Sequence, residues 1–120
     1  MIDREKLKKY EELQINGKPD VVIEIIESFL QTSKKIIKSL FFCLQNSDYK
    51  GASDNSHKLK SSAHAIGATV LGDLCAKIES LNEENKIDDI KIFSELLKNE
   101  YKNACNELND IKKSRGVKNI

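Results

Sequence analysis

This sequence has few helix-breaking residues and few aromatic residues, and its positive and negative charges nearly balance. The 120 residues include one proline, five glycines, three tyrosines, four phenylalanines and no tryptophan. With so little proline and glycine, the turn signals that separate short strands are missing. The shortage of aromatic rings argues against a platform for stacking nucleic-acid bases. The 20 basic and 19 acidic residues are spread along the chain, so neither a nucleic-acid footprint nor a polybasic membrane anchor is indicated.

Long apolar runs and cysteine pairs are also missing. The N-terminus is charged from its third residue, and the most apolar region, Val21 to Leu44, is interrupted by five charged side chains. A membrane span needs roughly 18 to 20 apolar residues, so we expect no signal peptide, no membrane span and a cytoplasmic location. Cys43, Cys75 and Cys105 have no metal-ligand spacing, and are interpreted as small apolar residues of a helix interior.

Apolar residues recur at spacings of three and four through most of the chain, which predicts an all-α fold. We expect a short N-terminal helix at about 3–15 and bundle helices at about 19–46, 49–66, 69–83 and 88–114. Gly116 is expected to close the last helix, with residues 117–120 frayed. Four amphipathic helices on short connections can bury their stripes as an antiparallel up-down-up-down bundle, and 120 residues allow a single domain.

The segment from Ser56 to Ala68 combines a packing face with a chemical face. At helical spacing, small and apolar residues form one stripe: Ala52, Ser56, Leu59, Ala63 and Ile66. Polar residues lie beside it: His57, Lys60, Ser61 and His64. A phosphorylatable histidine needs a nucleophilic ring nitrogen, a nearby cation for the phosphoryl oxygens and room for a partner. The ordinary alternative is a surface histidine beside a solvated lysine.

The run from His57 to Ala63, followed by Ile66-Gly67-Ala68, closely resembles the signature of histidine-containing phosphotransfer (HPt) domains. That signature is roughly His-x-Leu-Lys-Gly/Ser-Ser/Ala, then Gly-Ala at the turn to the next helix. The similarity extends upstream to Ile25 through Leu30. Downstream it includes Leu71, Cys75, Ile78 and Glu79, and in all it covers about residues 5 to 110.

The resemblance implies a four-helix bundle in which His57 is phosphorylated at Nε2. It further implies that Lys60 stabilises the transferring oxygens and that Glu79, from the adjacent helix, accepts the Nδ1 proton. Gly67 would form the turn. The family commonly has glycine where this chain has Ser61. Side chains expected around the docking surface are Lys58, Ser61 and His64.

The resemblance implies as partners the receiver domains of a hybrid sensor kinase and of a downstream regulator. We expect a monomer that binds neither nucleic acid nor membrane. No phosphate-binding loop or nucleotide site is present, so the chain is expected to be a relay intermediate without kinase activity. It would need no cofactor, with Mg²⁺ on the partner receiver. Two alternatives remain open: a phosphorylation-independent scaffold or inhibitor, and the histidine-bearing domain of a chemotaxis-type kinase.

Overall fold

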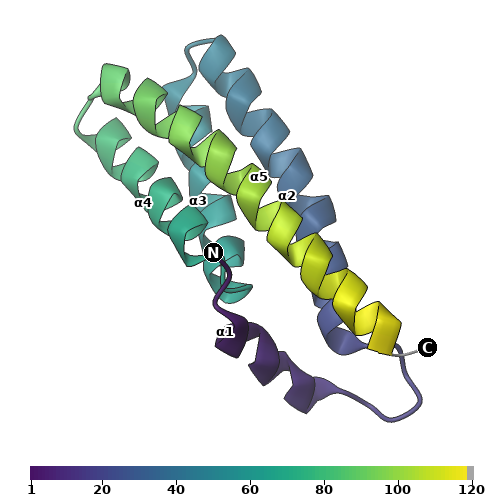
Figure 1. Cartoon of the computed structure of the whole chain (residues 1–120). Helices are drawn as coiled ribbons and strands as arrows, with labels where there is room; N and C mark the ends of the chain where they lie inside the picture. Colours follow the sequence, from purple (N-terminus) through teal and green to yellow (C-terminus); the bar gives the residue numbers. More distant parts are fainter. Residues whose placement is uncertain (119–120) are drawn as a thin grey trace.

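Helices joined by short connections make up the computed structural model, which describes residues 1–118 (Figure 1). No strand occurs within these residues. In chain order the elements are α1 (Arg4–Lys9), a 3-10 turn η1 (Tyr10–Leu13), α2 (Val21–Gln45), α3 (Tyr49–Ala65), α4 (Thr69–Glu83) and α5 (Ile87–Lys118). Within this range no helix combines the length and hydropathy of a membrane span.

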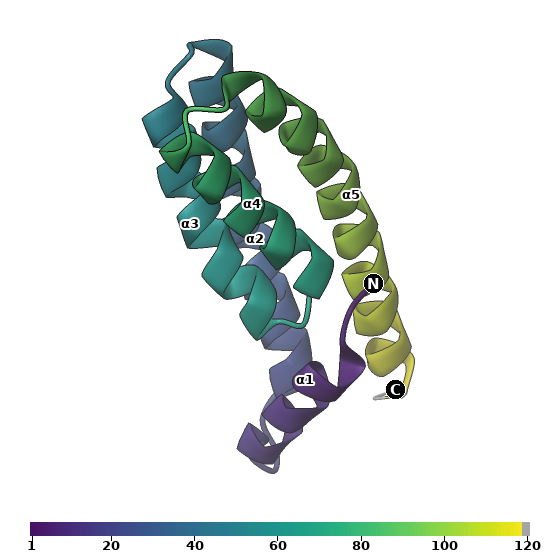
Figure 2. The ribbon, with the colours of Figure 1, turned by 90° about the vertical axis from the view of Figure 1, so that its left-hand side faces the viewer.

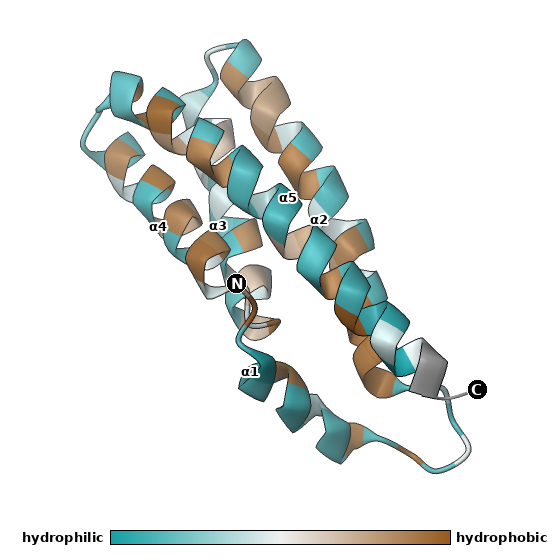
Figure 3. Cartoon of the chain, viewed as in Figure 1, coloured by the Kyte–Doolittle hydropathy of each residue, from teal (hydrophilic) through white to brown (hydrophobic). Residues whose placement is uncertain are grey.

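Helices α2 to α5 run alternately in opposite directions around one core (Figures 1 and 2). Hydrophobic and hydrophilic residues alternate along each of them (Figure 3), as expected for helices with one buried face. The largest fully buried hydrophobic residues are Val22, Ile26, Leu40, Leu59, Leu71, Cys75, Ile78, Ile90, Leu97 and Leu108. Burying one such aliphatic side chain contributes about 1.5–3 kcal/mol. The predicted all-α class and bundle arrangement are therefore confirmed.

Aspartates begin two of the bundle helices. Asp20 Oδ1 accepts a hydrogen bond from Val22 N at 2.9 Å, and Asp48 Oδ1 accepts one from Gly51 N at 2.9 Å. Each carboxylate satisfies an amide that the first turn leaves without a helical partner. A Cβ on Gly51 would lie 2.8 Å from Cys43 Sγ, so glycine lets α3 start close against α2.

The N-terminal helix is shorter than the expected 3–15. After Lys9 the chain tightens into η1, and the Gln14 side chain then organises a loop. Gln14 Oε1 accepts a hydrogen bond from Val21 N at 2.7 Å, while Nε2 donates to Lys18 O and Pro19 O. These bonds satisfy loop backbone groups outside a helix, and Leu13 remains 63% exposed.

At the other end, α5 continues through Gly116 to Lys118, and the prediction that Gly116 closes it is wrong. Glycine in a helix costs about 1 kcal/mol relative to alanine but does not by itself end the helix. Gly116 lacks the positive φ of a glycine cap. Arg115 is also held in place, since its Nε and Nη2 donate to the two carboxylate oxygens of Asp20. Residues 119 and 120 lie outside the described residues.

The first ten residues pack across the end of α3, with Ile2 and Leu7 buried. Asp3 N donates to Gly67 O at 2.7 Å, Lys6 Nζ to His64 O at 2.9 Å and Tyr10 Oη to Ala65 O at 2.9 Å. The last carbonyls of an α-helix have no partner within the helix. The N-terminal segment therefore supplies donors to the end of the helix that carries His57.

Candidate functional site

His57 projects from the middle of α3, on the side away from the core. The packing face expected from the sequence is buried: Ala52, Ser56, Leu59 and Ala63 are 0% exposed. The His57 side chain, by contrast, is 65% exposed. Because α3 buries one face completely, the helix has little freedom to rotate and turn this imidazole inward.

Glu79 on α4 fixes the orientation of the His57 ring. Its Oε2 lies 3.0 Å from His57 Nδ1, and its side chain is only 20% exposed. An ionised carboxylate can only accept hydrogen bonds, so in the neutral imidazole the proton resides on Nδ1. The Nε2 atom then carries the lone pair, and it has no hydrogen-bond partner among the described residues. The site thus presents a nucleophilic nitrogen to solvent.

Lys60 contacts the other oxygen of the same carboxylate. Its Nζ lies 2.9 Å from Glu79 Oε1, and its side chain is 29% exposed. Partial burial acts to raise the pKa of Glu79, but the ion pair with Lys60 and the hydrogen bond with His57 outweigh this and hold that pKa below its ordinary value. Glu79 is therefore a carboxylate near neutral pH, with one oxygen for each basic partner.

Cys75 lies one helical turn before Glu79 on α4 and is completely buried. Burial, with a smaller contribution from the Glu79 charge, raises the pKa of its thiol to about 12. The thiol is therefore neutral at physiological pH and acts as a small packing group. Cys43 and Cys105 are partly buried, which is less than the sequence interpretation expects.

His64, two turns after His57, makes a second contact between α3 and α4. Its Nε2 lies 3.1 Å from Asp73 Oδ1. A Cβ on Gly72 would clash with the imidazole of His64, so the ring packs directly over this glycine. Sequence reasoning identified His64 but missed Asp73 and Gly72, whose importance depends on how α3 and α4 are aligned.

Lys58 and Ser61 are both exposed on α3, and both lie on the C-terminal side of His57 within about one helical turn. Gly67 forms the turn between α3 and α4 with a φ of +89°. A Cβ on this glycine would lie 2.5 Å from Asp3 O. The turn therefore requires glycine for its backbone conformation, and also for the close approach of the N-terminal segment.

An apolar groove that sequence reasoning did not identify runs between α2 and the C-terminal half of α3. Its volume is about 270 Å³. We call it the α2–α3 groove; its lining residues are Tyr10, Ile25, Ser28, Phe29, Thr32, Ser62, Ala65 and Ile66. The α3 residue among them that is nearest to His57 in the sequence is Ser62, which lies five residues further along the helix and about 140° around it.

The described residues contain no group of three or more histidine, cysteine, aspartate or glutamate side chains placed to hold a metal ion. His57 and His64 are each turned toward a carboxylate of α4. The chemistry that this site offers is therefore nucleophilic attack by a ring nitrogen, with an ammonium group close by.

Comparison with known sequences identifies a family. The family model for the Hpt domain matches residues 24–109. Histidine-containing phosphotransfer protein 1 of Arabidopsis thaliana is 28% identical over 100 residues, which cover 82% of this chain and 65% of the relative. Histidine-containing phosphotransfer protein 5 of the same plant is 27% identical over 103 residues, with the same coverage of 82% and 65%. The chain thus spans just under two thirds of the length of these two curated relatives.

Solved structures show the same fold. The crystal structure of histidine-containing phosphotransfer protein B (HptB) from Pseudomonas aeruginosa PAO1 matches with a TM-score of 0.84 at 18% identity, covering 94% of this chain and 95% of that one. The maize histidine-containing phosphotransfer protein ZmHP2 matches with a TM-score of 0.83 at 21% identity, covering 97% and 86%. The bundle is common to all three proteins, and the family model spans well over half of this sequence. The chain therefore belongs to the Hpt domain family.

Proposed function

We propose that this chain is a phosphotransfer protein of a multistep two-component phosphorelay. In this proposal His57 accepts a phosphoryl group from the aspartyl phosphate of one receiver domain and passes it to the aspartate of another. The observation that carries the proposal is the state of His57, whose Nδ1 is held by Glu79 at 3.0 Å while the side chain remains 65% exposed. A nucleophile that must meet a protein-bound phosphate needs this combination of fixed orientation and access.

The transfer step follows from these contacts. The Nε2 lone pair attacks phosphorus in line, the bond from phosphorus to the aspartyl oxygen breaks, and the aspartate leaves as a carboxylate. The proton on Nδ1 stays there, shared with Glu79. Donation to that carboxylate stabilises the positive charge that develops on the imidazole as the new bond forms. Delivery to the second receiver is the reverse of this step.

Lys60 has two tasks in this proposal. An ammonium group has three N–H donors, so Nζ can keep its contact with Glu79 Oε1 while donating to a phosphoryl oxygen on Nε2. Negative charge spreads over the phosphoryl oxygens in the transition state, where a fixed cation is most effective. The chain itself binds no cofactor in this scheme, and Mg²⁺ would be held by the receiver's acidic site.

Receiver docking is proposed on the surface around His57. Lys58 and Ser61 are exposed there, and the apolar α2–α3 groove is lined by residues further along the same helix. An apolar centre with a polar rim is the usual construction of a protein interface. His64 would contribute from the far end of this surface while tied to Asp73. The receivers would be those of a hybrid sensor kinase and of a downstream regulator, met by a monomer of this chain.

The proposal is tested by incubating the chain with a receiver domain that has been charged by a small phosphodonor. We expect acid-labile, base-stable phosphate on the wild type and none on His57→Gln, with the same helical circular dichroism. His64→Gln removes the other histidine and should still take up phosphate on His57, although the loss of its proposed docking contact can slow the labelling. Labelling of His57→Gln would contradict the proposal. A wild-type chain that binds receivers but never takes up phosphate would point to the scaffold alternative.

A further inference from the structure

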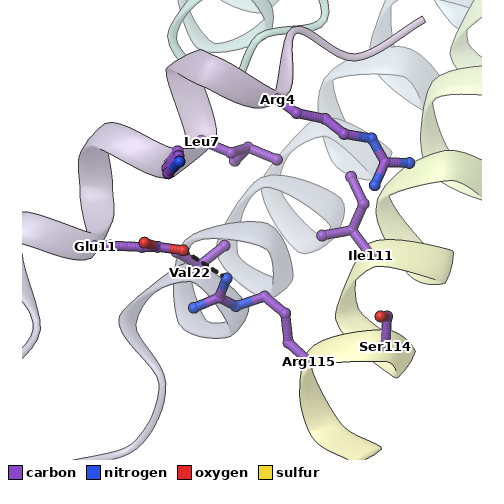
Figure 4. Close-up of a pocket in the computed structure, with 8 residues that line it drawn as sticks. Arg4, Leu7, Glu11, Val22, Ile111, Ser114 and Arg115 are labelled. Carbon is purple, nitrogen blue, oxygen red and sulfur yellow. Dashed lines mark hydrogen bonds and ion pairs between the residues drawn. The ribbon is translucent and has the colours of Figure 1, made fainter. Parts of the chain in front are cut away.

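A cavity of about 210 Å³ lies between α1, the first turn of α2 and the end of α5 (Figure 4). Its lining residues are Arg4, Leu7, Lys8, Glu11, Val22, Ile111, Ser114 and Arg115. None of them belongs to α3 or α4, which carry His57 and Glu79. The cavity is therefore a separate feature that phosphotransfer does not use.

The floor of the cavity is apolar and well ordered by packing. Leu7 is 3% exposed, Val22 1% and Ile111 9%, each from a different helix. Because all three belong to the buried core, the floor cannot readily close by side-chain rearrangement. An apolar ligand group placed here would replace water against an existing hydrophobic surface.

The rim has an excess of positive charge. Arg115 donates to Glu11 Oε1 at 2.9 Å and to Asp20, so its charge is already compensated. Arg4 is exposed and has no ion pair or hydrogen bond through its guanidinium within the described part of the chain, and Figure 4 shows it extending from α1 toward Ile111. Lys8 adds a further cation to the lining.

We infer that this cavity binds a small monocarboxylate with a compact apolar body. A guanidinium can bind a carboxylate through two parallel hydrogen bonds, and Arg4 is the lining arginine that is available for it. The Ser114 hydroxyl lies on the same rim and can donate a further bond. The apolar body would rest on Leu7, Val22 and Ile111.

The size of the cavity limits the ligand. Sites for drug-sized molecules have volumes of about 300–1,000 Å³, and this one is smaller. A single aromatic ring or a short branched chain fits, whereas a nucleotide does not. Such a ligand would bridge α1 and α5, and would thereby fix the N-terminal segment whose Lys6 and Tyr10 bond to the end of α3.

The test is a titration of the ¹⁵N-labelled full chain with sodium benzoate, followed by two-dimensional NMR. We expect saturable shifts of amides in α1 and the last turns of α5, with a Kd on the order of 1 mM for a ligand of this size. Acetate carries the charge without the apolar body, and benzyl alcohol carries the ring without the charge. Neither should saturate the same amides in the same concentration range.

Two variants make the result specific. Arg4→Gln should weaken benzoate binding by about tenfold or more, the loss expected for a charge-assisted hydrogen bond. Lys9→Gln removes an exposed cation from the same helix outside the cavity, and should leave the Kd unchanged. The inference is overturned if the shifts fail to saturate, if acetate reproduces them, or if Arg4→Gln binds as well as the wild type.

Discussion

Replacing Glu79 by alanine should slow phosphorylation of His57 while leaving the fold intact. The substitution removes the acceptor 3.0 Å from His57 Nδ1 and the ion-pair partner 2.9 Å from Lys60 Nζ. A hydrogen bond to a charged group contributes about 1.5–3 kcal/mol. Because each 1.36 kcal/mol in the barrier changes a rate tenfold, losing the bond to His57 is expected to slow transfer about 10- to 150-fold.

The glutamine variant separates the two partners of this carboxylate. In Glu79→Gln the amide oxygen can still accept the Nδ1 proton, but the amide nitrogen cannot pair with Lys60. We therefore expect this variant to keep the His57 tautomer and to transfer within about tenfold of the wild-type rate, since a neutral hydrogen bond contributes about 0.5–1.5 kcal/mol. The order of rates should be wild type, Glu79→Gln, then Glu79→Ala.

Two measurements decide the matter: the initial rate of labelling by a phosphorylated receiver, and the ¹⁵N chemical shifts of the His57 ring. The alanine variant should lose the preference for a proton on Nδ1. Glu84→Ala, which removes a carboxylate paired with Lys86 at the end of α4, is the matched control and should change neither observable for His57. The reasoning is refuted if Glu79→Ala keeps both the wild-type ring shifts and the wild-type rate.

Three further predictions follow from the same contacts. Lys60→Ala should slow labelling at least about tenfold and should lower the unfolding free energy by about 1–3 kcal/mol, because it leaves the buried Oε1 atom of Glu79 without its cationic partner; an unchanged rate would remove its role in transfer. Gly67→Ala should lower the unfolding free energy in urea by about 1–3 kcal/mol, and by more than Gly17→Ala, which shares a positive φ but has open space around it. Burial acts to raise the pKa of Asp20, but the hydrogen bond from Arg115 and those from the α2 amides hold it below its ordinary value. The contribution of the Asp20 carboxylate to the unfolding free energy is thus complete above about pH 4 and is lost as the pH falls through the lowered pKa. In Asp20→Asn the unfolding free energy should therefore fall less steeply in acid than in the wild type. An identical dependence on pH in the two proteins would contradict this.

The helices could be predicted from the sequence because their signals are local. The three-and-four spacing of apolar residues in α2 and α3 identifies the buried faces, and Asp48 marks a helix start because its carboxylate bonds to an amide three residues away. The wrong predictions for the end of the N-terminal helix and the end of α5 also have local causes. The Gln14 side chain bonds to four backbone groups in the loop that follows α1, a network that no apolar spacing announces. Gly116 is of the residue type that most often ends a helix, but its φ is not positive, so the helix continues through it.

The candidate site could be predicted from the sequence only in part. The sequence by itself determined that His57 and Lys60 lie together outside the buried stripe of one helix, since a spacing of three residues makes them neighbours on any α-helix. Only the tertiary structure decided that Glu79 contacts both of them, that His64 is bound to Asp73 over Gly72, and that an apolar groove and a second cavity flank the bundle. Those contacts depend on the rotation and alignment of one helix against another, which the interlocking of side chains across the whole core determines.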